Sequence, residues 1–320
     1  MNAVIELTAI SKTFGQHRAV NNLSLTVPRG SIYGFIGPNG SGKTTTIRMI
    51  MHIYHPDPGS GRILVLGQES HSAANDRVGY LPEERGLYKK MKVRDLLRFY
   101  AELKGKPNVR VVADRWLERM GLTDWANKKV DTLSKGMSQK VQFIAAVIAE
   151  PELVILDEPF SGLDPVNADV LRDAVLELRR AGSTIIFSTH DMAVAEKMCD
   201  SIFMIYRGEK VLDGTMDEIQ ARYGQDTLRV RLESGAQDFN HLPRVDKVTD
   251  FGRLKELKLA EGADTQEVLQ ALLQRGRVEH FEVTRPSLHD IFVRIAGPDA
   301  REVRQNPLDG PARKAEAAYA

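Results

Sequence analysis

Residues 37–44 read Gly-Pro-Asn-Gly-Ser-Gly-Lys-Thr, which is the spacing of a phosphate-binding loop. Ser31 to Ile36 before the loop is a β-rich run, and Thr44 to His52 after it has the character of a helix start. Glycines let successive N–H groups turn toward one anion, and a helix N-terminus adds about half a positive charge. The predicted triphosphate site comprises Gly37, Pro38, Asn39, Gly40, Ser41, Gly42, Lys43, Thr44 and Thr45, with Lys43 on the outer phosphates and Thr44 on Mg²⁺. A plain glycine-rich turn is the alternative.

Three further polar residues follow apolar runs of strand length. Asp157 and Glu158 come directly after Leu153 to Leu156, and His190 comes shortly after Thr184 to Phe187. Open α/β sheets bind ligands at the carboxyl ends of their strands. We therefore expect Asp157 to hold Mg²⁺, Glu158 to polarise the attacking water and His190 to act on the terminal phosphate. Alone, each would be an ordinary loop carboxylate or structural histidine.

A second helix start carries a small hydroxyl and a glycine. Ser134 and Gly136 precede a segment whose apolar residues share one helical face. Such a helix start can bind an anion, and Ser134 can otherwise serve as a simple N-cap.

The elements that position these residues alternate between strand and helix. The two apolar runs suit strands of a parallel sheet covered on both faces, and Pro165 to Arg180 has the period of an amphipathic helix. From Val93 through Ala149 the pattern is amphipathic helix without a comparable strand. The predicted fold class is α/β with a mostly parallel sheet and a helical insertion at about residues 84–150.

A change of texture near residue 223 predicts a second domain. Thr227 to Leu232 alternates like a strand, while Thr265 to Gln274 and Leu288 to Ile295 carry helical apolar stripes. We predict a nucleotide-binding domain over residues 1–222 and a small α+β domain over residues 225–297. Residues 298–320 have no apolar period and are predicted to be a disordered tail.

Composition narrows the class of protein. The 320 residues are 42% hydrophobic and 27% charged with a net charge of +1, which fits a globular chain and does not point to nucleic acid. The mean hydropathy of −0.29 and the absence of an apolar run of membrane-spanning length argue against membrane embedding. Without a secretory-type N-terminus and with the single Cys199, a reducing cytosol is expected.

Taken together, these motifs resemble those of the ATP-binding subunits of ABC transporters over roughly residues 3–220. Leu133-Ser134-Lys135-Gly136 is similar to the signature motif of that family, and Ser161 to Asp164 is similar to its D-loop. Phe14 is similar to the aromatic residue that stacks on adenine, although it could equally be a strand-end packing residue. Tyr80 to Glu84 is similar to a loop that usually carries a glutamine.

The resemblance implies a P-loop NTPase of the ABC type that uses ATP and Mg²⁺. It implies that two cassettes face head to tail, so that Ser134 and Gly136 serve nucleotide bound mainly by the other subunit. Asp164, in the D-loop, is a further implied nucleotide-binding residue. The implied partners are a second ATP-binding subunit and a membrane permease, with the chain peripheral on the cytoplasmic face of the membrane. Residues 81–88 and 288–294 further resemble single-cassette export ATPases, including the sodium-efflux type.

Two positions depart from the family pattern. Lys135 stands where the signature usually has glycine, and Glu83 stands where the loop usually has glutamine. A carboxylate at position 83 could still bind Mg²⁺, directly or through water, but it adds negative charge beside ATP.

The sequence is compatible with two other functions. An ABC-type ATPase of a soluble machine is one alternative, although neither a second cassette nor a long coiled coil is present. A nucleotide-gated binding module with little turnover is another. The basic run of Lys89, Lys90, Lys92 and Arg94 is either a solvated surface or a contact with anionic headgroups.

Overall fold

The computed structural model describes residues 3–69, 76–84, 86–223, 227–233, 239, 242–250, 252–260 and 262–297. The chain forms two compact units, Met1–Gly214 and Thr215–Asn306. The predicted tail, residues 298–320, lies outside the described residues.

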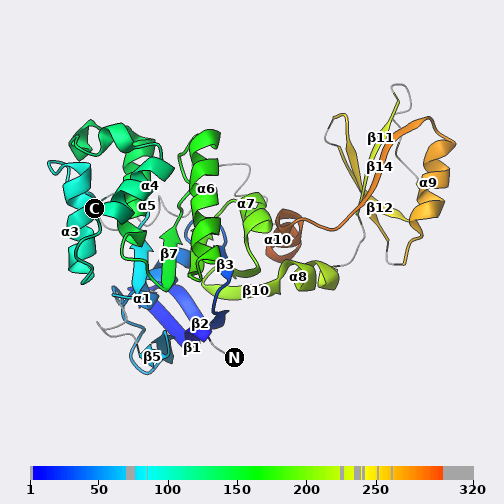
Figure 1. The fold of residues 1–320 in the computed structure, drawn as a ribbon. Coiled ribbons are helices and arrows are strands. Elements are labelled where there is room, and N and C mark those ends of the chain that lie inside the picture. The colour runs from blue at the N-terminus through cyan, green and yellow to red at the C-terminus, as the bar shows by residue number, and fades with distance from the viewer. Residues whose placement is uncertain are drawn as a thin grey trace. The chain divides into compact units, whose positions relative to one another are not determined.

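A six-stranded sheet forms the centre of the first unit (Figure 1). Its order is β10 (Glu209–Thr215), β9 (Ser201–Tyr206), β3 (Ile32–Ile36), β8 (Thr184–Thr189), β7 (Leu153–Asp157) and β6 (Val78–Leu81). Strand β3 pairs in parallel with β8 and β9, and β7 pairs in parallel with β6 and β8. Every residue of β3, β7 and β8 is buried, as expected of parallel strands covered on both faces. The predicted mostly parallel α/β sheet is confirmed.

Alternate residues of a strand point to opposite faces, and strand β7 shows how this divides the core. Val154 and Leu156 pack into one apolar cluster, which includes residues of the helical insertion. Leu153 and Ile155 pack into a second cluster on the other face. Because both faces are apolar and covered, the polar residues of the region are confined to the strand ends.

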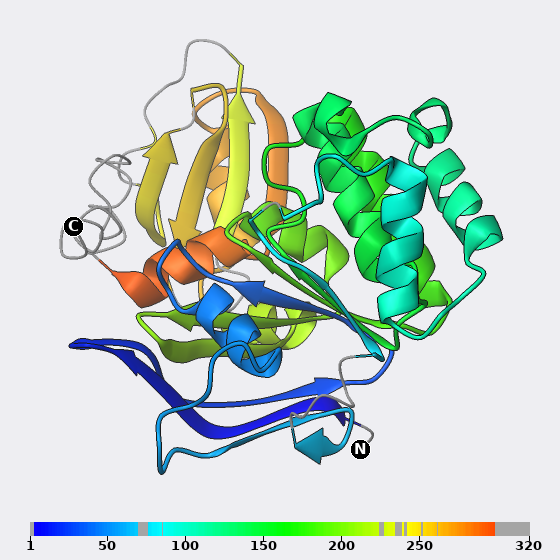
Figure 2. The same ribbon diagram turned by 90° about the vertical axis from the view of Figure 1, so that its left-hand side faces the viewer.

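The second cluster is covered by an antiparallel sheet and a helix. The sheet order is β2 (His17–Pro28), β1 (Ala3–Phe14), β4 (Arg62–Val65) and β5 (Gln68–Glu69), and the helix is α1 (Lys43–Ile50). Strands β1 and β2 appear in blue in Figure 2, apart from helices α3 to α5. This antiparallel sheet was not predicted from the sequence.

The helical insertion covers the first cluster. It contains α3 (Val93–Leu103), α4 (Arg110–Arg119), α5 (Lys135–Val147) and two short 3₁₀ turns, Thr123–Trp125 and Val130–Thr132. Helix α5 carries buried Val141, Phe143 and Ile144 toward the sheet. Helices α6 (Pro165–Arg180) and α7 (Met192–Met198) follow β7 and β8.

The second unit contains a four-stranded antiparallel sheet. Its order is β12 (Val245–Asp250), β13 (Lys255–Leu259), β11 (Thr227–Leu232) and β14 (Val278–Thr284). Helix α9 (Thr265–Leu273) lies along one face of this sheet and buries Val268 and Leu272 against Leu228 and Leu257 (Figure 1).

The division between the units falls before the boundary predicted at residue 222. Side-chain hydrogen bonds join helix α8 (Met216–Tyr223) to the segment that leads into α10 (Leu288–Ala296). The Gln220 amide donates to the Pro286 carbonyl, and the Arg285 guanidinium pairs with Asp217 at 2.8 Å. These contacts join segments far apart in sequence, which the sequence pattern does not reveal.

Across the described residues, no helix is both long enough and apolar enough to cross a bilayer.

Candidate functional site

Strand β3 delivers the glycine loop to the start of α1, as predicted. Gly37 and Gly42 have positive φ values of 156° and 110°. A Cβ at Gly37 would collide with the Ile205 carbonyl, and one at Gly42 would collide with the Ala19 carbonyl. Only glycine fits this close approach of the backbone. The tight loop leaves Asn39 exposed at its turn.

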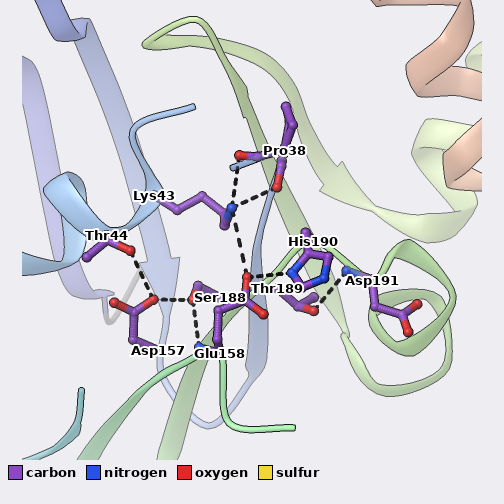
Figure 3. Close-up of polar contacts among 10 residues, drawn as sticks. Pro38, Lys43, Thr44, Asp157, Glu158, Ser188, Thr189, His190 and Asp191 are labelled. Atoms are coloured by element: carbon purple, nitrogen blue, oxygen red, sulfur yellow. Dashed lines mark hydrogen bonds and ion pairs between the residues drawn. The ribbon is translucent and has the colours of Figure 1, made fainter. Parts of the chain in front are cut away.

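Lys43 is buried beneath the loop, with 6% of its surface exposed. Its Nζ donates to the carbonyls of Gly37 at 2.7 Å and Pro38 at 3.1 Å, and lies 4.0 Å from Glu158 Oε1 (Figure 3). Burial lowers the pKa of the Lys43 ammonium, while the nearby carboxylates oppose that shift. The loop therefore holds a poorly hydrated cation, which suits it to an anionic ligand.

Asp157 ends strand β7 and is 1% exposed. Its Oδ1 accepts from Thr44 Oγ1 at 3.3 Å and from Ser188 Oγ (Figure 3). Its buried Oδ2 has no hydrogen-bond partner among the described residues. A buried carboxylate oxygen without a partner is costly, so this atom is available for a cation. Thr44 and Asp157 supply the hard oxygen donors that Mg²⁺ prefers, and the pair fits the predicted metal.

Glu158 leaves the strand in a left-handed conformation with a φ of 49°. A non-glycine residue rarely adopts this conformation, and such strain concentrates at functional sites. Its N–H donates to Ser188 Oγ at 3.0 Å, and its Oε1 lies 3.0 Å from His190 Nδ1 (Figure 3). The carboxylate is thus held between Lys43 and His190.

The parallel register explains why these residues meet. Ile36 pairs with Thr189, and Asp157 pairs with Ser188, so β3, β7 and β8 end together. The glycine loop, the Asp157–Glu158 pair and His190 therefore converge at one sheet edge.

Glu83 lies near the carboxylate pair. It lines a pocket of ≈ 440 Å³ together with Asp157, Glu158 and Lys135. Partial burial, followed by the charges of Asp157 and Glu158, raises the pKa of the Glu83 carboxyl. Yet no three Asp, Glu, His or Cys side chains in the described ranges are grouped to bind a metal ion. Glu83 as a metal ligand therefore stays a prediction.

Ser134, Gly136 and Asp164 lie in a separate group. Ser134 Oγ caps helix α5 by accepting from the Met137 N–H at 3.3 Å. Asp164 caps helix α6 through the Asn167 N–H, and this bond lowers the pKa of Asp164. Gly136 faces Leu163 and Asn167 of that same region. Within the described part of the chain, no hydrogen bond or ion pair ties these three residues to the glycine loop.

Phe14 ends β1 and packs edge-on against Tyr54, with the ring centroids 5.3 Å apart. Lys12 Nζ lies 5.5 Å from the Phe14 centroid. These contacts show the packing role that the sequence left open, and adenine stacking stays a prediction.

Sequence reasoning missed three residues that position the site. Ser188 bonds both Asp157 and the Glu158 backbone. Gln139 and Gln142 are buried on α5. Gln139 donates to the carbonyl of Pro159, which follows Glu158, and Gln142 donates to the carbonyl of Glu84, which follows Glu83. A polar residue closing the apolar β8 run was a usable signal for Ser188. The glutamines gave none, because their partners are backbone atoms distant in sequence.

Comparison with known proteins places this geometry in a family. The ABC transporter family model matches residues 20–161. The ABC transporter ATP-binding protein YhaQ of Bacillus subtilis is 40% identical over 296 residues, covering 92% of this chain and 99% of the relative. The chain belongs to the ABC transporter ATP-binding proteins. This membership implies ATP binding and hydrolysis.

Three further similarities cover the C-terminal domain, nearly the full chain and the ATPase fold. The C-terminal domain of DrrA1-3-like ATP-binding proteins matches residues 214–296, which confirms the resemblance to the single-cassette export-type group. The daunorubicin resistance ATP-binding protein DrrA3 of Streptomyces coeruleorubidus is 32% identical, covering 94% of this chain and 98% of its own. A solved ATP-binding subunit of an ABC transporter aligns with a TM-score of 0.65 at 30% identity, covering 69% of this chain and 93% of that one. The predicted P-loop ATPase fold is confirmed.

Proposed function

We propose that this chain hydrolyses ATP to drive a separately encoded membrane permease, and that the transport is export. The observation that carries the proposal is the convergence of Lys43, Asp157, Glu158 and His190 at one sheet edge, with Lys43 4.0 Å and His190 3.0 Å from the same Glu158 oxygen.

The chemistry required of the protein is mainly positioning and electrostatic stabilisation. The loop N–H groups and Lys43 bind the phosphates, and Glu158 orients water and accepts its proton. His190 fixes the Glu158 carboxylate through their 3.0 Å contact and faces the terminal phosphate. Thr44 and Asp157 would hold Mg²⁺, which would supply charge neutralisation.

Among the described residues, no hydrogen bond or ion pair joins Ser134 or Gly136 to the glycine loop, as expected if they serve a two-subunit site. We infer that these residues and Asp164 complete the phosphate site of a second ATP-binding subunit. ATP then acts through its higher affinity for the closed pair than for the open one. Phe14 is proposed to stack on adenine.

The proposed location is the cytoplasmic face of the membrane, beside the permease. The direction of transport rests on relatives such as the daunorubicin resistance protein and on the C-terminal domain that they share.

ATP hydrolysis by the purified chain, alone and with the membrane protein that co-purifies with it, tests the proposal. We expect turnover that depends on Mg²⁺ and changes when the membrane protein is added. Absence of turnover in both samples, with ATP still bound, would instead favour the nucleotide-gated binding module.

A further inference from the structure

Two segments of the helical insertion pair through their backbones and bring five lysines together. Residues 89–93 lie antiparallel to residues 128–131, with Lys92 directly opposite Lys129. The Asp131 N–H donates to the Lys89 carbonyl at 2.9 Å, and the Val93 N–H donates to the Lys128 carbonyl at 3.0 Å. We call the resulting surface the lysine patch; its members are Lys89, Lys90, Lys92, Lys128 and Lys129.

The patch differs from the basic run seen in the sequence. Arg94 is engaged elsewhere, since its guanidinium pairs with Asp114 at 2.6 Å and donates to Asn127 at 3.2 Å. Lys128 and Lys129, distant in sequence, take its place. All five lysines are exposed, and none lies within ion-pair distance of a carboxylate among the described residues. Asp131 is the one acidic residue in the two segments.

Stability does not explain this arrangement. Like charges directly opposite on paired strands repel, as Lys92 and Lys129 do here. Lys92 also occupies the N-cap position of α3, where a positive charge opposes the helix dipole. A chain with a net charge of +1 thus concentrates unpaired cations where folding disfavours them.

Exposed aromatic surface adjoins the patch. Tyr88 precedes Lys89 and is 55% exposed, and its ring packs edge-on against Phe99 with centroids 5.5 Å apart. Aromatic rings with a polar tip beside basic residues are typical of surfaces that sit at a membrane–water interface.

We propose that the lysine patch binds the headgroups of anionic phospholipids directly, with Tyr88 at the level of the headgroups. Lysines near an anionic leaflet attract it as point charges, without the fixed fork geometry that arginine uses to read bases and phosphates. The choice of a membrane over nucleic acid rests on the proposed function beside a permease. The binding itself is independent of ATP turnover.

Sedimentation of the full chain with vesicles tests the patch. The probes are vesicles of phosphatidylcholine alone and of phosphatidylcholine mixed equally with phosphatidylglycerol. We expect binding to the anionic vesicles, weakened by raised salt because the charges are exposed. The K128A/K129A variant should bind roughly 30-fold more weakly, since each lysine contributes about five-fold.

A matched variant controls for net charge. K106A/K197A removes two exposed lysines outside the patch and should bind like the parent chain. K89A/K90A, on the other segment, should weaken binding as K128A/K129A does. The use of two independent variants keeps the test valid if one of them misfolds. Both patch variants should retain the basal ATP turnover of the parent, so a failed patch and a failed ATPase assignment give different results.

Three outcomes would overturn the proposal. They are equal binding to neutral vesicles, equal loss in the patch and control variants, and tighter binding to a short RNA than to anionic vesicles under the same salt.

Discussion

At the scale of single residues, we propose that turnover depends on Glu158. Its carboxylate lies between Lys43 and His190, and its backbone is held in a left-handed conformation. Glu158→Gln keeps the shape and removes the basic oxygen. We expect ATP to bind normally and hydrolysis to slow by about 10² to 10⁴-fold, the usual range for a general base.

Single-turnover hydrolysis and equilibrium ATP binding measure the two effects separately. Glu84→Gln is the matched control because that side chain is 90% exposed. Near-normal turnover in Glu158→Gln would remove Glu158 from the proposed role.

Lys43 should instead act on binding. Its Nζ is buried and donates to the Gly37 carbonyl of the loop. Loss of a charge-assisted hydrogen bond costs about 1.5–3 kcal/mol, so Lys43→Ala should bind ATP roughly 10- to 100-fold more weakly. Titration calorimetry measures this, with exposed Lys106→Ala as the control. An unchanged affinity would contradict the phosphate-loop assignment.

Glu83 gives a prediction about pH. Burial and the neighbouring carboxylates raise the pKa of Glu83 above its usual 4.5. The folded chain therefore holds this proton to higher pH than the unfolded chain, and stability falls as pH rises from 4.5 through the raised pKa.

Glu83→Gln removes the ionisable carboxyl and therefore the fall in stability with rising pH. The variant should be more stable than the parent at neutral pH, and the difference should vanish below pH 4.5. Urea unfolding across this range measures the free energy of each protein. A difference that does not vary with pH would show that the Glu83 charge is not disfavoured by its surroundings.

The sequence could identify the glycine loop, Asp157, Glu158 and His190 because each follows a recognisable apolar strand. It could not show that Ser188 bonds two of them, or that Asp164 caps a helix, since these depend on strand register and local turns. The position of Glu83 beside Asp157 and Glu158 likewise depends on tertiary packing, which the sequence pattern does not reveal.

At the scale of elements, the buried strands and amphipathic helices were predictable from their periods. Helix α6 and strand β11 have the bounds expected. The antiparallel sheet of β1, β2, β4 and β5 was missed, although Leu23, Leu25 and Val27 of β2 alternate with exposed residues. Register shifts in the pairing of β1 with β2, as between Leu7 and Ile10, break that alternation elsewhere.

Helix α5 bonds both the loop after Glu158 and the loop after Glu83, through Gln139 and Gln142. Substitution of Gln139 tests the first of these bonds. Its amide donates to the buried Pro159 carbonyl, just beyond Glu158. Gln139→Leu leaves this carbonyl without a donor and should lower the free energy of unfolding by about 1–3 kcal/mol. Turnover should also fall, because the Glu158 loop loses a support.

Urea denaturation and ATP hydrolysis check both effects. Gln270→Leu, exposed on α9, is the matched control and should change stability by about 0.5 kcal/mol or less. Equal stability in the two variants would show that the Gln139 bond does not hold the loop.

At the scale of the whole molecule, we propose that each chain carries two halves of a phosphate site and that the two halves serve different nucleotides. Thr44 of the glycine loop bonds Asp157, whereas Gly136 lies beside Leu163 and Asn167 near the start of α6. Two copies facing head to tail would bring unlike halves together. ATP would then form part of the interface, and loss of its terminal phosphate would weaken that interface.

The association state of Glu158→Gln tests this claim most directly, because ATP persists when turnover is blocked. The measurement is sedimentation velocity of the variant with and without saturating ATP and Mg²⁺. We predict that the 35.7 kDa chain becomes a two-chain species with ATP and returns to a single chain when ATP is removed. A single chain under both conditions, with ATP shown to be bound and the co-purifying membrane protein supplied, would contradict it.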